Sequence, residues 1–183
     1  MYPRGWKKYC DSMKQKGFKP GENEARFAAR YRLAKAFRHI EWHGIAKATA
    51  DGFETALKVS LAYNTLEALA KITKAKPYEI EIIEQKLAKF IRSKASQKLC
   101  DFLICELDKR PADKIKEWLG NINDNNVSRI AMGIRHLTVH GILTSGGAGL
   151  TASKTLCNHL NQLAEAVLNA CDRKFLAYYE GLR

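Results

Sequence analysis

Apolar side chains recur every three or four residues over most of this chain, and no other feature restricts its fold as strongly. The clearest case lies between residues 151 and 179, where the recurrence is carried by Leu156, Leu160, Leu163, Val167 and Ala170. Such spacing puts the apolar side chains on one side of an α-helix. No segment shows the sustained alternation, with β-branched enrichment, that is typical of strands. The sequence therefore predicts an all-α fold, a bundle of about five to seven helices.

Two long helices are predicted in the first half of the chain. One covers residues 22–43, is rich in Ala, Arg, Lys and Glu, and stops at Gly44, a residue suited to a helix C-terminus. The other covers residues 52–73 and follows a capping box formed by Asp51 and Glu54. Because this second helix is apolar around most of its circumference, we expect it to be central.

Further helices are predicted downstream. Pro77 opens one whose apolar period continues past a kink near Ser93, and Pro111 starts a shorter one. Residues 127–143 have the spacing of another helix, and the Gly-rich residues 144–149 form a turn before the last one.

The chain carries a net charge of +12, from 31 Lys and Arg against 19 Asp and Glu. The surplus is concentrated in residues 1–47, which hold 12 Lys and Arg but only four Asp and Glu. Residues 1–21 also contain several Gly and Pro, so we predict a basic, irregular N-terminal arm ahead of a single all-α domain over residues 22–183. A basic field attracts polyanions. RNA or another nucleic acid is the first candidate partner, and an anionic membrane surface is the second.

The cysteines and the start of the chain bear on its compartment. Five cysteines occur, an odd number, and no CxxC pair is present, which favours free thiols in a reducing compartment. The first ten residues lack the apolar core of a secretory signal, and no stretch approaches 18 uninterrupted apolar residues. We therefore expect a cytoplasmic protein that does not enter a membrane.

Two similar heptapeptides hold four of the five histidines: RHIEWHG at residues 38–44 and RHLTVHG at residues 135–141. In each, the histidines are four residues apart, and such a pair on a helix can share a metal ion. Only Glu41 supplies a carboxylate close to either pair. We therefore predict no metal site and no cofactor, while a metal-dependent protein stays open as one alternative.

The second heptapeptide combines a fixed cation with titratable imidazoles. Arg135 can neutralise phosphate oxygens, and His140 can accept or donate a proton near neutral pH. RNA cleavage needs a base for the 2′-hydroxyl, an acid for the leaving 5′-oxygen and a cation for the charge on phosphorus. This residue set therefore suits RNA cleavage.

A narrow polar stripe follows the otherwise apolar helix predicted over residues 52–73. It consists of Ser60, Asn64, Glu67 and Lys71. The stripe is either a solvated face or the lining of a groove. In a central helix a polar stripe needs partners, and Arg135 could supply one for Glu67.

The segment IRHLTVHG resembles the R-x4-6-H motif of the HEPN (higher eukaryotes and prokaryotes nucleotide-binding) family, an all-α family. In that family a polar residue typically follows the Arg and a Gly often follows the His, as His136 and Gly141 do here. The upstream segment LAYNTLEAL is similar to the helix in which many members place a Tyr and a Glu toward the groove, which corresponds to Tyr63 and Glu67. The resemblance covers roughly residues 50–180.

The resemblance implies metal-independent ribonuclease activity, usually in a homodimer and often in toxin–antitoxin or phage-defence settings with an antitoxin or other partner protein. Some members keep the fold and only bind nucleotides or partners. A non-catalytic module that binds nucleic acid or a protein therefore stays open as an alternative.

Four residues are predicted to be catalytic. Arg135 would stabilise the phosphate and His140 would transfer the proton. His136 would orient the substrate or supply the second proton, and Glu67 would hold Arg135 in place.

Three further residues are predicted to bind substrate: Asn64, Arg38 and His43. For the heptapeptide that contains Arg38 and His43, two interpretations stay open. It is either the structural end of a helix, closed by Gly44, or a basic segment that leads RNA toward the groove.

Overall fold

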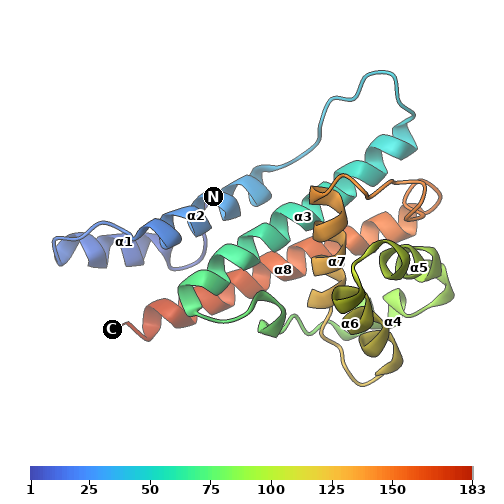
Figure 1. Cartoon of the computed structure of the whole chain (residues 1–183). Helices are drawn as coiled ribbons and strands as arrows, with labels where there is room; N and C mark the ends of the chain where they lie inside the picture. The colour runs from blue at the N-terminus through green and yellow to red at the C-terminus, as the bar shows by residue number, and fades with distance from the viewer. Residues whose placement is uncertain (183) are drawn as a thin grey trace.

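The computed structural model describes residues 1–182, and over this range the fold is all-helical (Figure 1). The all-α prediction is confirmed, with eight α-helices in the described range instead of about five to seven. They are α1 (Trp6–Gln15), α2 (Glu22–Ala36), α3 (Lys47–Thr73), α4 (Gln85–Ile91), α5 (Gln97–Glu106), α6 (Lys109–Gly120), α7 (Ser128–Val139) and α8 (Lys154–Glu180). Two 3-10 turns, Pro77–Glu79 and Lys94–Ser96, separate some of them.

The two 27-residue helices α3 and α8 form the centre of the molecule. They run side by side in the same direction, from the right to the lower left of Figure 1. The apolar stripe predicted on α8 is confirmed, since every residue of it is buried. Residues 52–73 are also central as predicted, because Val59, Leu66 and Leu69 of α3 have no exposed surface.

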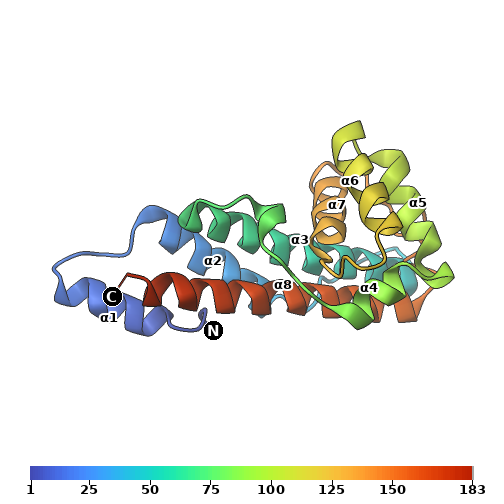
Figure 2. The ribbon, with the colours of Figure 1, turned by 90° about the horizontal axis from the view of Figure 1, so that it is seen from below.

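Helix α2 runs antiparallel to this pair. Its beginning lies near the end of α8, where the Tyr178 hydroxyl donates to Glu24. Its end lies near the first half of α8, where Lys35 donates to Glu165 at 2.6 Å. The three long helices α2, α3 and α8 therefore pack together. Helices α4 to α7 gather at the end of the molecule where α3 and α8 begin (Figure 2).

The predicted irregular arm is wrong over Trp6–Gln15, which form α1. Tyr9 is only 3% exposed, and the rings of Trp6 and Tyr9 lie 5.7 and 5.8 Å from that of Phe175 on α8. The many lysines hide an apolar face, since Trp6, Tyr9 and Met13 recur at helical spacing. Burial of that face stabilises a helix that would be too short to persist alone in water.

A buried carboxylate also fastens the chain's beginning. Asp172 of α8 is 6% exposed and accepts hydrogen bonds from the Arg4 backbone N–H at 2.9 Å and the Tyr31 hydroxyl at 2.8 Å. Burial, followed by the bond to Asp172, raises the pKa of Tyr31 well above its ordinary value. Asp172 thus joins the N-terminal segment, α2 and α8.

The helix predicted over residues 22–43 ends early, at Ala36, and residues 37–46 are irregular. The predicted capping box is also absent, because α3 already begins at Lys47 and Glu54 accepts a bond from the backbone N–H of Ile40. Most helical stability comes from tertiary packing of an apolar face. Residues 38–45 are exposed, so this segment has no buried apolar face. Its contacts with α3 include the ring of Trp42, which lies 5.8 Å from that of Phe53.

The helix predicted from Pro77 is wrong before residue 85. Pro77 opens only a 3-10 turn, and the next residues are extended, with one isolated bridge between Ile83 and Asn126. Farther on, Arg92 donates to the carbonyl oxygens of Trp118, Asn121 and Asp124 at 2.6 to 2.9 Å. Its guanidinium carbon lies 3.9 Å from the centre of the Trp118 ring. The Arg92 side chain therefore supplies hydrogen-bond donors to carbonyl oxygens at and after the end of α6, and it connects α6 to α4.

Two further structural findings concern cysteines and membranes. All five cysteines carry free thiols, and Cys100, Cys157 and Cys171 are buried. Among residues 1–182 no helix has both the length and the apolar character needed to cross a membrane.

Candidate functional site

Helix α7, which contains Arg135, crosses α3 (Figure 1). Ile130, Ile134 and Leu137 of α7 have no exposed surface and fix the orientation of the helix. Gly133 allows the close approach to α6, because a Cβ there would lie 3.0 Å from the Ile115 side chain. The side chain of Arg135 is thereby directed toward the polar stripe of α3.

Arg135 forms two side-chain hydrogen bonds with that stripe. Its Nε donates to Oδ1 of Asn64 at 3.1 Å, and its Nη2 donates to Oε2 of Glu67 at 2.9 Å. The contact between Arg135 and Glu67 that the stripe predicts is therefore present. The side chains of Arg135 and Glu67 are each 26% exposed, so the pair is only partly screened by water. Nη1 forms no hydrogen bond with any described residue, so the guanidinium retains donors for a ligand.

Tyr63, one turn before Glu67, belongs to the core. It is 2% exposed, and burial, with a smaller effect of Glu67, raises the pKa of its hydroxyl well above the ordinary value. Tyr63 is therefore a core residue of α3, and its hydroxyl is not accessible from the surface.

Arg135 and Glu67 line an open groove of about 600 Å³. We call it the Arg135 groove; its remaining lining residues are Arg30, Ala70, Lys71, Lys74, Ala75 and Pro77. Four cationic side chains face it against a single carboxylate. Such a concentration of positive charge attracts phosphate groups.

The sequence predicted this groove in part. Asn64, Glu67 and Lys71 of the polar stripe lie at or beside it, whereas Ser60 is 3% exposed and lies in the interior. Arg30 and Lys74 were missed. Arg30 comes from α2, and its Nη1 donates to the Asn64 carbonyl at 3.2 Å. The basic surplus of residues 1–47 was the only sequence signal for it.

The histidines of the second heptapeptide face elsewhere. His140 directly follows α7 and is exposed, and its ring centre lies 4.5 Å from that of His136. Nε2 of His136 is 3.9 Å from Oδ2 of Asp108, which precedes α6. At about 100° per residue, His136 and His140 lie roughly 100° and 140° around the helix from Arg135.

The structure thus forms two separate sets. One contains Arg135, Glu67 and Asn64, and the other contains His136 and His140. No histidine lines the Arg135 groove within the part of the chain that the structure describes. Within one chain, Arg135 therefore lines the groove and His140 lies outside it.

The first heptapeptide has a different structure from the second. RHLTVHG ends α7, with Gly141 at φ +69°, whereas RHIEWHG lies wholly in the irregular segment 37–46. Arg38 donates to the Lys35 carbonyl and lines a cavity of about 310 Å³ with Lys58.

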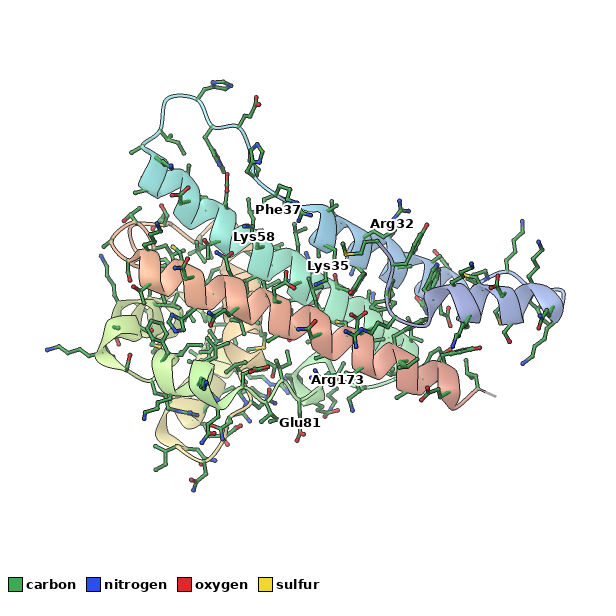
Figure 3. All side chains as sticks on the ribbon, turned by 180° about the vertical axis from the view of Figure 1, so that it is seen from behind. Arg32, Lys35, Phe37, Lys58, Glu81 and Arg173 are labelled. Carbon is green, nitrogen blue, oxygen red and sulfur yellow. The ribbon has the colours of Figure 1, made fainter. Side chains whose placement is uncertain are left out.

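That cavity is remote from the Arg135 groove. Lys58 and Glu67 are nine residues apart on α3, which places them on opposite faces of the helix. Figure 3, seen from behind, shows Lys35, Phe37 and Lys58 on this far side. His43 is exposed in the same segment. Arg38 and His43 therefore do not join Asn64 at the groove.

Metal-ligating side chains are dispersed in residues 1–182. This range contains no group of three or more His, Cys, Asp or Glu side chains arranged to hold a metal ion. Comparison with known proteins adds no identification, because no family model, curated protein or solved structure gives a significant match to this chain.

Proposed function

We propose that this protein is a metal-independent endoribonuclease of HEPN type that binds RNA in the Arg135 groove. The observation that carries the proposal is the position of Arg135. Glu67 and Asn64 hold its guanidinium at the edge of a groove that also presents Arg30, Lys71 and Lys74. The resemblance of IRHLTVHG to the HEPN motif supplies the reaction type.

The groove supplies binding and charge stabilisation. Each Lys or Arg that neutralises a phosphate releases counterions, so affinity falls with rising salt concentration. Arg135 is the cation with a fixed orientation, because Glu67 and Asn64 limit the rotamers open to it. A pre-oriented guanidinium stabilises developing negative charge at little reorganisation cost.

The reaction consists of one transesterification. A base removes the proton of the RNA 2′-hydroxyl, the 2′-oxygen attacks the adjacent phosphorus, and the bond to the 5′-oxygen breaks as that oxygen receives a proton from an acid. The products are a 2′,3′-cyclic phosphate and a 5′-hydroxyl. His140 is the proposed proton-transfer residue, and His136, in ring contact with it, orients the substrate or supplies the second proton.

A homodimer would bring the two residue sets together. Because Arg135 and His140 face different sides of α7, we place Arg135 of one copy opposite His140 of a second copy in a two-fold assembly. Val139 and Ile142, on either side of His140, are 54% and 39% exposed. Apolar side chains at that position would be buried by such an interface.

The biological setting is proposed by resemblance alone. It would be a cytoplasmic toxin or defence effector, held inactive by an antitoxin or other partner protein. The net charge of +12 would favour an acidic partner.

A non-catalytic RNA-binding module is the second candidate. The separation of His140 from Arg135 within one chain favours it, since a binding groove needs only the cations. Both candidates predict salt-dependent RNA binding, so binding alone does not separate them.

Incubation of the purified protein with a mixed RNA, with and without EDTA, tests the proposal. Cleavage that resists EDTA and leaves DNA of the same sequence uncut supports the ribonuclease, because DNA has no 2′-hydroxyl. Cleavage that EDTA abolishes would contradict it and point to a metal-dependent enzyme. Salt-dependent binding without cleavage would favour the second candidate.

A further inference from the structure

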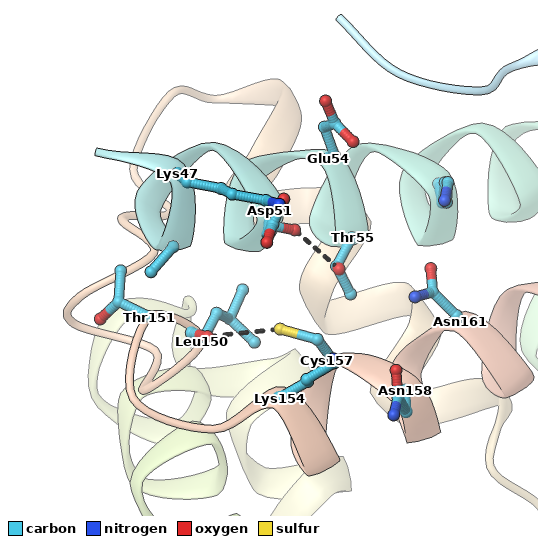
Figure 4. A pocket seen from close by; sticks show the side chains of 12 residues that line it. Lys47, Asp51, Glu54, Thr55, Leu150, Thr151, Lys154, Cys157, Asn158 and Asn161 are labelled. Carbon is cyan, nitrogen blue, oxygen red and sulfur yellow. Dashed lines mark hydrogen bonds between the residues drawn. The ribbon is translucent and has the colours of Figure 1, made fainter. Parts of the chain in front are cut away.

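A second cavity lies on the face of α3 opposite to the Arg135 groove, between the first turns of α3 and α8 (Figure 4). We call it the α3–α8 cavity. Its volume is about 530 Å³, within the range of small-ligand sites. It shares no lining residue with the Arg135 groove, so nothing in the proposed ribonuclease reaction uses it.

Three lysines line the cavity from the two helices: Lys47, Lys58 and Lys154. Among the described residues none of them forms an ion pair, whereas Lys35 nearby is neutralised by Glu165. Lys47 and Lys154 are the first residues of α3 and α8, and neither helix has an acidic residue in its first turn. The partial positive charge of two helix amino ends therefore adds to the lysine charges.

Some polar side chains of the cavity have a hydrogen-bond partner within the protein, and one lacks a partner. Thr55 donates to the Asp51 carbonyl at 2.8 Å, and Cys157 donates to the Leu150 carbonyl at 3.3 Å. In contrast, Oδ1 of Asn161 is buried and has no hydrogen-bond partner among the described residues. Burial of an unpaired carbonyl oxygen costs free energy. A ligand donor that reached this oxygen after a small rotation of the Asn161 side chain would recover that cost.

The acidic residues of the cavity restrict what kind of anion fits. Asp51 and Glu54 also line it, and Glu54 already accepts the backbone N–H of Ile40. A polyanion would be repelled by these carboxylates. A ligand with one anionic group and several hydroxyls would satisfy both the lysines and the acceptors, since hydroxyls donate to carboxylate and amide oxygens.

We propose that the α3–α8 cavity binds a phosphate monoester of a hydroxylated small molecule. The phosphate contacts Lys47, Lys154 and the amino end of α8. The hydroxyls face Asn158, Asn161 and Asp51. Figure 4 shows Lys47 and Asp51 together at the start of α3, and Asn158 and Asn161 rising from α8 toward α3.

Calorimetric titration with ribose 5-phosphate, inorganic phosphate and ribose tests the site on the whole protein. Saturable binding of ribose 5-phosphate, weaker binding of phosphate and none of ribose is expected. Loss of the two lysine contacts with the phosphate in K47Q/K154Q should weaken ribose 5-phosphate binding by about tenfold or more. Lys47 and Lys154 are exposed, so the fold, checked by circular dichroism, should be retained.

The matched control is K71Q/K74Q, which removes two lysines from the Arg135 groove and should leave ribose 5-phosphate binding unchanged. Absence of saturable binding at millimolar ribose 5-phosphate would overturn the proposal. So would loss of binding in K71Q/K74Q with full binding in K47Q/K154Q. N161L should also weaken ribose 5-phosphate more than inorganic phosphate. The titration measures binding of ribose 5-phosphate and not RNA cleavage, so its result tests the α3–α8 cavity independently of the proposed ribonuclease.

Discussion

Replacement of Asp172 by Ala should destabilise the protein and detach its N-terminal segment. Asp172 is 6% exposed, and its carboxylate accepts the backbone N–H of Arg4 and the hydroxyl of Tyr31. After the change both donors lose their acceptor. The hydroxyl is the more costly of the two, because Tyr31 is itself only 2% exposed.

The magnitude follows from these two bonds. A hydrogen bond to a charged group contributes about 1.5 to 3 kcal/mol. The two together therefore contribute about 3 to 6 kcal/mol, from which relief of the buried carboxylate's desolvation must be subtracted. We expect a net loss of about 2 to 4 kcal/mol, which in a chain of this size lowers Tm by about 4 to 16 °C.

Thermal unfolding followed by circular dichroism measures this effect. The control is Glu165→Ala on the same helix, whose carboxylate pairs with Lys35 but is 62% exposed and should matter by less than about 1 kcal/mol. Tyr31→Phe and the double variant complete a mutant cycle, in which the two changes should be less than additive. A Tm for Asp172→Ala within about 2 °C of wild type would refute this account of the N-terminal attachment.

Three other perturbations have defined outcomes. Arg92→Lys should cost about 2 to 3 kcal/mol in urea unfolding, because Lys cannot reproduce the three carbonyl contacts together with stacking on Trp118; an unchanged midpoint would contradict this. Burial raises the pKa of Cys100 to about 11, and burial with the bond to a glutamate raises the pKa of Tyr178 to about 12. The unfolded chain releases these two protons at lower pH than the folded protein does, so the urea midpoint of unfolding should fall as pH rises from about 9 to 12. A midpoint that does not change with pH over this range would refute these two pKa shifts. Deletion of residues 1–21 should weaken RNA binding and flatten its salt dependence; an unchanged salt slope would exclude a role for this segment.

Local periodicity predicted the parts of the fold in which one helix face meets the core. The stripe of α8 and the central position of α3 follow from the sequence, since apolar spacing fixes which face is buried. Local signals failed where tertiary contacts decide. Helix α1 depends on Phe175, far along the chain, and α2 ends where burial ends, since residues 38–45 are exposed.

The candidate site was predictable to a similar extent. The contact of Arg135 with Glu67 follows from a polar stripe that needed a partner in a buried helix. The position of His140 did not follow, because a five-residue spacing gives an angle on the helix and no information on what each side chain faces. The two heptapeptides show the same limit, since similar residues end a helix at Gly141 and form an irregular segment at Gly44.

Complementation between two inactive variants tests the proposed ribonuclease most directly. Arg135→Ala and His140→Ala should each reduce EDTA-resistant RNA cleavage by about 10²- to 10⁴-fold while keeping their helicity. After the two variants are mixed and allowed to exchange subunits, half of the dimers carry one intact pair of Arg135 and His140 at one of two sites. We predict recovery of about a quarter of wild-type cleavage, with 2′,3′-cyclic phosphate ends. Cleavage that persists in folded His140→Ala, or a mixture that stays inactive, would contradict an active site shared between two copies.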